Sequence, residues 1–278
     1  MPRFTDTATC LARFPYSETS QVVTLLCRER GKLRGLAKGC LRSSPGAVAR
    51  FTGGFEPLTG GTATATTRPA WELAAVTGWD LQRPRHGLRA SLERLRLGCY
   101  AAQLADALLA ELDPHPGLFD ALATLLDALA GPAADPQAAL LGYHWSFFTE
   151  LGYRPELGRD VHRDAPLDAA APATFDPAAG GFTADPGPAA WRVRPSTRAA
   201  LAAAAEDARP ADRVAERAEQ AAVRGLPGAD LARANRLMCS YARALLDREL
   251  PTMRYVLGTG SPPPGAATAA GAATAARR

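Results

Sequence analysis

The basic side chains of residues 28–39, RERGKLRGLAKG, are the residues of this chain best suited to chemistry with a partner. The stretch holds five Lys and Arg side chains against one acid, and it contains both lysines of the chain, Lys32 and Lys38. Lysine and arginine neutralise phosphate groups and release their counterions, so that binding depends strongly on salt and little on base sequence. The stretch therefore favours contact with a polyanion, although an ordinary solvated strand face has the same composition.

The charge of the chain is divided unevenly along its length. Residues 1–98 contain 15 Lys and Arg against 7 Asp and Glu, a net charge of +8. The remaining 180 residues contain 17 against 21, a net charge of −4. This division places the predicted polyanion site in the first part of the chain alone.

The first 80 residues have the pattern of short strands separated by turns. Segments 7–14, 21–27 and 32–38 are apolar or alternating, and two further strands follow before residue 82. Five short antiparallel strands suit a small closed barrel, and the OB-fold is the common barrel of that size. Because side chains alternate along a strand, Lys32, Arg34 and Lys38 are expected on one face of the third strand.

From residue 87 the hydrophobic period lengthens to between three and four residues, which predicts helices. The helical patterns cover residues 88–112, 117–130, 136–151, 196–224 and 229–250. The sequence thus predicts an α+β chain in which a five-stranded OB-fold barrel precedes an all-helical domain. The predicted divisions are the barrel at 1–82, the helical domain at 83–257 with an irregular, Pro- and Gly-rich insert at 152–195, and a disordered tail at 258–278.

Signals for catalysis, secretion and membrane insertion are missing from the sequence. The phosphate-loop, dinucleotide, HExxH and GxSxG motifs do not occur. The four histidines lie far apart, and His144, within YHWSFF, has the surroundings of a core histidine. Five cysteines never spaced as CxxC fit a reducing cytosol, and no apolar run approaches the roughly 20 residues of a membrane helix. We therefore expect a cytoplasmic protein that is no enzyme and has no signal peptide, cofactor, metal or membrane contact.

Two blocks of the sequence resemble the RecO family of bacterial DNA repair and recombination proteins. The first block, FPYSETSQVVTLLCRERGKLRGLAKG, follows the family pattern at Tyr16, Glu18, Ser20, Glu29, Gly31, Lys32, Leu33, Ala37, Lys38 and Gly39. The second block, LLGYHWSFFTELGYRPEL, follows it at Leu151, Gly152, Tyr153, Pro155 and Leu157. The resemblance extends over roughly residues 5–255.

The resemblance implies a mediator of homologous recombination in the RecF pathway. Such proteins bind single- and double-stranded DNA, anneal complementary strands, contact the C-terminal tail of single-stranded-DNA-binding protein, and help RecR to load RecA on the nucleoid. The side chains that we expect to bind DNA are Arg13, Arg28, Arg30, Lys32, Arg34, Lys38, Arg42 and Arg50, extended by the arginines of QRPRH. Phe51 is the expected base-stacking residue, and the expected protein contact on the last helix consists of Arg233, Arg236 and Arg243.

One segment departs from the family pattern. Many relatives carry two CxxC pairs that bind zinc after the second block, but here Asp160 and Arg163 stand at the first pair, and Ala184 and Gly187 at the second. Arginine, alanine and glycine cannot hold structural zinc. We therefore expect no metal, a solvated acidic loop around Asp160, and a less rigid segment at 158–190.

Two other functions stay open at this point. An RNA-binding OB module of translation or ribosome assembly would need exposed aromatic side chains on the barrel. A scaffold with weakened DNA binding would act through protein contacts alone. Salt-dependent binding to DNA, preference for RNA, or binding to neither distinguishes the three functions.

Overall fold

The computed structural model describes residues 3–67, 72–185, 187, 191–207 and 225–258. The chain divides into two compact units, unit 1 at residues 1–139 and unit 2 at residues 140–278. The last β-strand of the barrel ends at Arg83, but unit 1 continues to residue 139, so the predicted domain boundaries stay predictions. The predicted tail after Gly258 and the second half of the predicted helix 196–224 lie outside the described residues.

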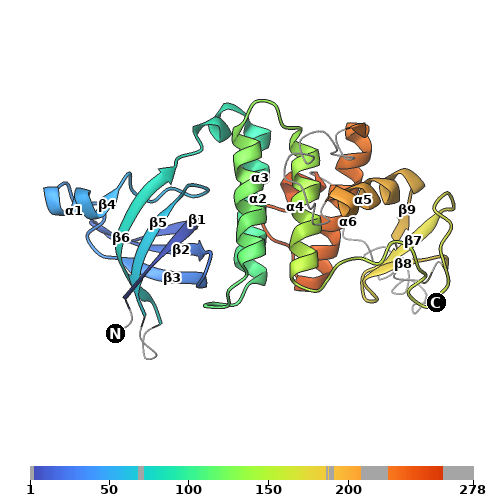
Figure 1. Ribbon diagram of the computed structural model, residues 1–278, viewed down its shortest axis with the longest axis horizontal. Helices are drawn as coiled ribbons and strands as arrows, with labels where there is room; N and C mark the ends of the chain where they lie inside the picture. Colours follow the sequence, from blue (N-terminus) through green and yellow to red (C-terminus); the bar gives the residue numbers. More distant parts are fainter. Residues whose placement is uncertain (1–2, 68–71, 186, 188–190, 208–224, 259–278) are drawn as a thin grey trace, which may run out of the picture. The chain divides into compact units, whose positions relative to one another are not determined.

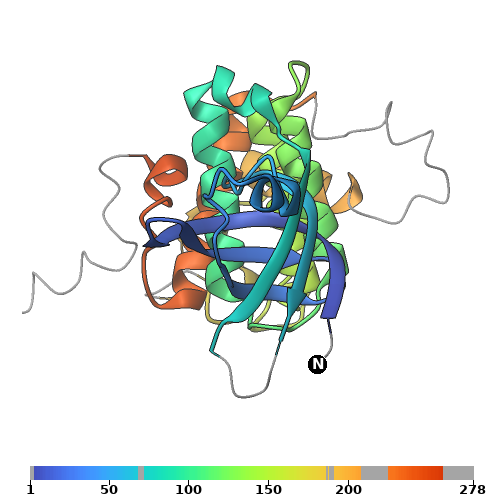
Figure 2. The same ribbon diagram turned by 90° about the vertical axis from the view of Figure 1, so that its left-hand side faces the viewer.

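Five strands of unit 1 form the closed OB-like barrel that the sequence predicts (Figures 1 and 2). They are β1 (Arg3–Ser17), β2 (Ser20–Cys27), β3 (Gly31–Ala37), β5 (Gly60–Thr66) and β6 (Ala74–Arg83). Neighbours pair antiparallel in the order β3-β2-β1-β5-β6, and a parallel pairing of β3 with β6 closes the barrel. The helix α1 (Pro45–Arg50) and the strand β4 (Phe51–Thr52) join β3 to β5, and α1 lies in front of the strands in Figure 2.

The barrel core follows from alternation along β3. Leu33 is 2% exposed and Ala37 is fully buried, so the side chains that alternate with Lys32 and Arg34 along β3 face inward. Gly35, between them, is where β3 meets β6: a Cβ atom there would lie 2.5 Å from Cγ2 of Val76. Because β3 and β6 approach so closely, the closing pair requires a residue without a side chain.

The rest of unit 1 is helical and packs beside the barrel. It contains the 3₁₀ helix η1 (His86–Ala90), α2 (Leu92–Leu108) and α3 (Pro116–Ala130). Ser91 caps α2, since its Oγ accepts a hydrogen bond from the Arg94 backbone N–H, and a proline begins α3. The Leu112 N–H after α2 donates to the Lys32 carbonyl in β3 at 2.8 Å, which holds the turn between α2 and α3 against the barrel.

Unit 2 is built around α4 (Pro136–Glu150), α5 (Pro195–Asp207), α6 (Gly228–Leu246) and α7 (Arg254–Leu257). Phe147, Phe148 and Tyr241 fill its core. His144 is fully buried, and its Nδ1 lies 3.0 Å from Oδ1 of Asn235, which confirms the prediction of a core histidine. Burial lowers the pKa of His144 to about 4. No helix among the described residues is long and apolar enough to cross a membrane.

The segment 152–195, which the sequence predicts to be irregular, contains a three-stranded sheet of unit 2. Its order is β8-β7-β9, with β7 at Ala173–Asp176, β8 at Gly181–Thr183 and β9 at Trp191–Val193. Strands of three or four residues are too short to show a two-residue period among so many Pro and Gly residues. Phe175 and Phe182 are fully buried, and the ring of Phe175 lies 5.1 Å from that of Tyr241 in α6, so the aromatic core of this sheet continues into the core around α6.

Candidate nucleic-acid interface

Two of the predicted cations, Lys32 and Arg34, lie at alternate positions of β3, and the helices cover one end of that strand. Lys32 has a side chain only 11% exposed, and its Nζ lies 3.4 Å from Oδ1 of Asp106 in α2. Arg34 is exposed. The prediction that Lys38 shares this strand face is wrong, because β3 ends at Ala37 and the exposed Lys38 lies in the turn that follows. The end of β3 at Lys38 is therefore open to a partner, whereas Lys32 serves the contact between barrel and helix.

Several other predicted cations are also paired with carboxylates inside unit 1. Both Nε and Nη2 of Arg28 bind the carboxylate of Asp120 in α3, each at 2.9 Å. Nη1 of Arg34 lies 3.8 Å from Glu111, and Nη2 of Arg13 lies 3.6 Å from Glu56. Before one of these cations can neutralise a phosphate it must leave its carboxylate, so its contribution to DNA binding is reduced.

The arginines of QRPRH, predicted to extend the track, both reach Asp127 of α3. Arg83 binds it at 2.6 Å and Arg85 at 2.7 Å. The Arg85 side chain is only 3% exposed and also donates to the Leu58 carbonyl at 2.8 Å. Arg85 is thus a structural residue that ties the barrel to α3.

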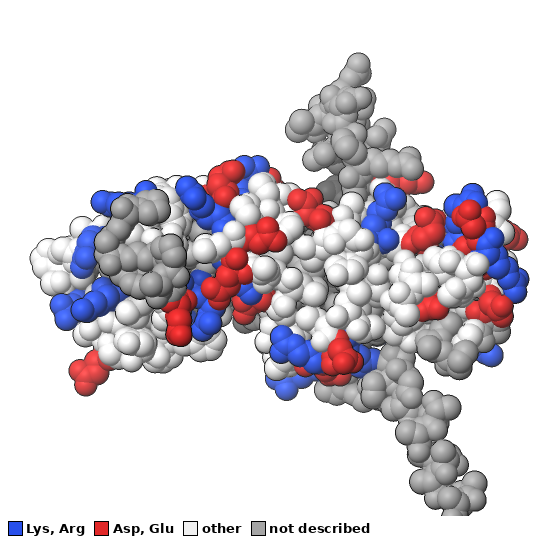
Figure 3. All heavy atoms as spheres, turned by 90° about the horizontal axis from the view of Figure 1, so that it is seen from below, with Lys and Arg blue, Asp and Glu red and all other residues white. Residues whose placement is uncertain are grey.

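Four predicted cations remain without a carboxylate partner among the described residues: Arg30, Lys38, Arg42 and Arg50. All four are exposed. The guanidinium groups of Arg30 and Arg50 lie over the rings of Phe4 and Phe51, at 5.1 and 5.6 Å. Figure 3 shows basic side chains over the barrel surface of unit 1, with acidic ones among them beside the helices. The unpaired cations define the candidate interface.

A buried carboxylate shapes the turn that carries Arg30. Asp6 in β1 is 8% exposed, and its Oδ2 accepts a hydrogen bond from the Glu29 N–H at 3.0 Å. Burial raises the pKa of Asp6, although the hydrogen bonds from the turn oppose this shift. Asp6 thereby fixes the backbone of the β2–β3 turn.

The prediction that Phe51 stacks on bases is wrong. Phe51 is 5% exposed, and its ring lies 5.9 Å from that of Phe55 in the barrel core. Among the described residues of the barrel, the exposed aromatic side chains are those of Phe14 and Tyr16, at 58% and 63%. Their position beside Pro15, next to the polar turn of a hairpin, is the signal in the sequence from which this exposure could be predicted.

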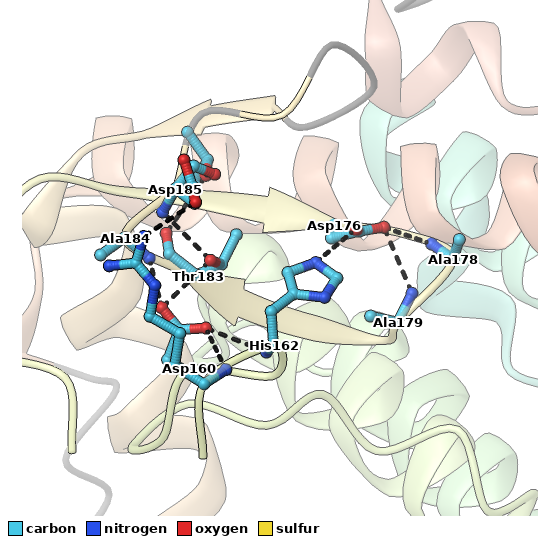
Figure 4. A network of polar contacts seen from close by, with 10 residues as sticks. Asp160, His162, Asp176, Ala178, Ala179, Thr183, Ala184 and Asp185 are labelled. Carbon is cyan, nitrogen blue, oxygen red and sulfur yellow. Dashed lines mark hydrogen bonds and ion pairs between the residues drawn. The ribbon is translucent and has the colours of Figure 1, made fainter. Parts of the chain in front are cut away.

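The segment that carries zinc in many relatives is organised here by Asp160 (Figure 4). Oδ1 of Asp160 accepts the N–H groups of His162 and Arg163, at 2.9 and 3.1 Å. Oδ2 accepts the Ala184 N–H at 2.8 Å and the Thr183 hydroxyl at 3.1 Å. One carboxylate thus joins the two places where the resemblance puts the cysteine pairs.

These residues do not fit a zinc ion. Ala184 and Gly187 carry no ligand atom, and the Arg163 guanidinium binds Asp185 at 2.9 Å. Within the described ranges no three His, Cys, Asp or Glu side chains are placed to hold a metal. The expectation of a solvated loop is wrong for Asp160, which is 3% exposed. The hydrogen bonds to its carboxylate, the one from Ala184 foremost, lower the pKa of Asp160 to about 2.

Comparisons with known proteins agree with this architecture. Residues 1–85 match the family model "Recombination protein O N terminal", and residues 89–226 match "Recombination protein O C terminal". The chain belongs to the RecO family. The DNA repair protein RecO of Anaeromyxobacter sp. (strain Fw109-5) is 33% identical over 199 residues, which cover 71% of this chain and 76% of the relative.

More distant members of the RecO family show a similar extent of likeness. The DNA repair protein RecO of Halorhodospira halophila is 31% identical over 193 residues, 69% of this chain and 77% of the relative. The names of these relatives describe DNA repair and state no enzymatic activity. This chain is thus a RecO-family DNA repair protein whose N-terminal domain is an OB-like barrel.

The expected protein contact of this RecO-family chain lies on α6 of unit 2. Arg233 pairs with Asp230, and Arg243, whose side chain is 11% exposed, binds Glu249 at 3.1 Å. Arg236 is exposed and has no carboxylate partner among the described residues. The apolar stripe beside these arginines is buried in the core, at Leu231, Ala234, Leu237, Met238 and Tyr241. Only Arg236 is therefore free to meet an acidic partner.

Proposed function

We propose that this RecO-family protein binds single- and double-stranded DNA through its phosphates, anneals complementary strands, and helps RecR to load RecA, without catalysing a chemical step. The observation that carries the proposal is a set of four exposed barrel cations to which no carboxylate of the described ranges is paired: Arg30, Lys38, Arg42 and Arg50. Association with the nucleoid follows from DNA binding of this kind.

Annealing requires two polyanions to approach each other. Cations that have no internal partner lower this repulsion, and each phosphate contact releases condensed counterions into solution. Phosphate contacts do not depend on the base sequence, so one surface can bind any pair of complementary strands. The proposed binding is therefore general in sequence and sensitive to salt.

The C-terminal tail of single-stranded-DNA-binding protein is the second proposed partner. The exposed guanidinium of Arg236 on α6 supports an electrostatic contact with such an acidic tail. Because the apolar stripe of α6 is buried, the proposed contact is a charge contact at the surface of unit 2.

Fluorescence anisotropy with labelled single-stranded and duplex DNA over a salt series tests the proposal. The triple variant Arg30→Ala, Lys38→Ala, Arg42→Ala should lower the slope of log K against log salt by roughly one unit per lost phosphate contact. The matched control is the triple variant Arg13→Ala, Arg28→Ala, Arg34→Ala, which removes three paired cations of the same barrel. Its slope should change less.

The result that contradicts the proposal is an unchanged slope in the first triple variant. A stronger affinity for RNA of matched sequence would support the RNA module in its place. Absence of salt-dependent binding to either nucleic acid would support the protein scaffold.

A further inference from the structure

An apolar strip crosses the open end of the barrel's outer face. Cross-strand pairing sets Phe14 of β1 opposite Val22 of β2, and Val22 opposite Leu36 of β3. Residues that pair directly across antiparallel strands project from the same face of a sheet. Phe14 is 58% exposed, and Val22 and Leu36 are partly exposed. The strip therefore runs across three strands and is open to a ligand at its aromatic end.

Basic side chains flank this strip on the same face. Arg34 lies two residues before Leu36 in β3, and Lys38 lies in the turn directly after β3 ends at Ala37; both are exposed. The loop that follows β3 is tied to the β1–β2 hairpin, since the Leu41 N–H donates to the Thr19 carbonyl at 3.0 Å. This bond brings the exposed Arg42, the next residue, to the same side of the barrel.

Tyr16 extends the aromatic surface along the hairpin. It is 63% exposed and occupies the irregularity in the β1–β2 register between Pro15 and Ser17, where β1 has one residue more than β2. A residue in such a bulge has no cross-strand neighbour to pack against. Phe14 and Tyr16 thus offer two ring faces to solvent on one short hairpin.

From this geometry we infer that Phe14 and Tyr16 form a stacking platform for the unpaired bases of single-stranded DNA. The phosphates of that strand follow the two cations without a carboxylate partner among the described residues, Lys38 and Arg42. The inference rests on the proposed function and adds the form of DNA that the surface selects. Bases within a duplex already stack on each other and present no free face, so the platform favours single strands over duplex DNA.

Charge complementarity identifies nucleic acid as the occupant of this strip. The rings and the strip are bordered by three exposed cations, and the hairpin residues 14–22 contain one carboxylate, Glu18. Every base has an aromatic face, so stacking adds affinity without selecting sequence, as general strand annealing requires. Each stacked base adds on the order of tenfold to a hundredfold in affinity.

The test compares three DNA probes of equal length: a single strand, the same strand with abasic sites, and a duplex. The double variant Phe14→Ala, Tyr16→Ala should lose roughly tenfold or more in affinity for the single strand. Its affinity for the abasic strand and the duplex should stay within about twofold of the wild type, with an unchanged salt slope. Phe14→Leu keeps apolar area without the ring and should show part of the loss.

Tyr153→Ala removes an exposed aromatic side chain of unit 2, 46% exposed, and serves as the matched control with no expected effect. Equal losses on all three probes, or no loss on the single strand, would overturn the stacking platform while leaving phosphate binding intact. A wild type that binds no probe would overturn the proposed function and this inference together. A variant that changes only the sedimentation of the protein would show that the strip joins copies of the chain, and the inference would be wrong.

Discussion

The outer face of the barrel and the segment 156–193 use charge in opposite ways. On the barrel, Lys38 and Arg42 are exposed without a carboxylate partner among the described residues. In the segment, charged groups close on one another: Arg159 binds Asp164 at 2.7 Å and His162 lies 2.9 Å from Asp176. The state of pairing, more than the number of charges, separates a surface that can meet a polyanion from one that stabilises its own fold.

The two lysines of the chain show the same contrast within one short stretch. Lys32 lies in the third barrel strand and Lys38 in the turn directly after it, yet α2 supplies Asp106 to the first, and no carboxylate of the described residues contacts the second. The two lysines look alike in the sequence, but Lys32 joins the barrel to α2, whereas Lys38 is open to a partner.

Replacing the carboxylate of Asp160 should loosen the segment 156–193 from within, because the four groups that donate to it all belong to this segment. In Asp160→Ala, the N–H groups of His162, Arg163 and Ala184 and the buried hydroxyl of Thr183 lose their acceptor, and a buried donor without a partner is destabilising. Hydrogen exchange should report loss of protection at these amides. The barrel amides should keep theirs.

Asp160→Asn is the matched variant, since it keeps the shape of the side chain but has one acceptor oxygen in place of two. It should retain the hydrogen bonds to one of the two side-chain oxygens and lose those to the other, and the loss of amide protection should be intermediate. Full protection in Asp160→Ala would mean that the segment is held by Phe175 and Phe182 alone, and the comparison of the two regions would fail.

Acid should weaken unit 2 through His144. Its pKa is about 4 in the folded protein and 6.5 unfolded, so the unfolded state binds more protons in this interval. Stability is fully present above pH 6.5 and is lost as the pH falls toward 4, by at most about 3 kcal/mol. Urea unfolding at pH 7, 5.5 and 4.5, monitored through the hydrogen exchange of the α4 amides, measures this loss.

The barrel should respond to acid with the opposite sign. The folded pKa of Asp6 is raised, so the folded state binds the extra proton and this group favours folding as the pH falls through its folded pKa. His144→Gln should remove the acid loss in unit 2 and leave the barrel response unchanged. An equal acid loss in both units would show that His144 does not account for it.

Releasing a paired cation should give the smallest effect and the most direct test of the comparison. In Asp120→Asn, Arg28 loses the carboxylate that binds two of its nitrogens and keeps only the exposed carboxylate of Glu29, at 2.6 Å. The salt slope for DNA should rise by at most about one unit, since Arg28 then has one competing carboxylate in place of two. Exposed ion pairs contribute little to stability, so the melting temperature should hardly change.

The isosteric change Asp135→Asn removes a carboxylate that caps the start of α4, where it accepts the Gln137 N–H at 2.8 Å. This variant removes one negative charge, as Asp120→Asn does, but it frees no barrel cation. The salt slope for DNA binding should therefore stay unchanged. The same rise in both variants would mean that net charge alone sets the affinity.

The barrel strands could be predicted from the sequence because their signals are local. The alternation that puts Leu33 and Ala37 inside and Arg34 outside spans a few residues, and so does the helical period after residue 87. The pairing of the cations could not be predicted this way. Arg28 meets Asp120 across 92 positions of the chain, and no local pattern encodes such a contact.

The aromatic residues of the site show the same limit. Phe51 stands beside Arg50 in the sequence, which suggested a stacking residue, but pairing of β4 with β6 sets it opposite Trp79 in the barrel core. Pro15 and the polar hairpin turn indicate the exposure of Phe14 locally, but its neighbours on the same face, Val22 and Leu36, come from other strands and no local pattern identifies them. Asp160 was recognised only as a missing cysteine, because its partners in β8 lie more than 20 positions away.

The carboxylate of Asp160 gives the segment 156–193 a different chemical sensitivity from that of a thiolate site. Thiolates are oxidised to sulfenic acids and disulfides and give up their metal to chelators, whereas a carboxylate held by N–H groups is inert to both. The folded pKa of Asp160 lies below its usual 3.8, so its contribution is present above that pH and is lost only as the pH falls toward 2. In a cell under oxidative stress or short of zinc, this part of the protein keeps its shape.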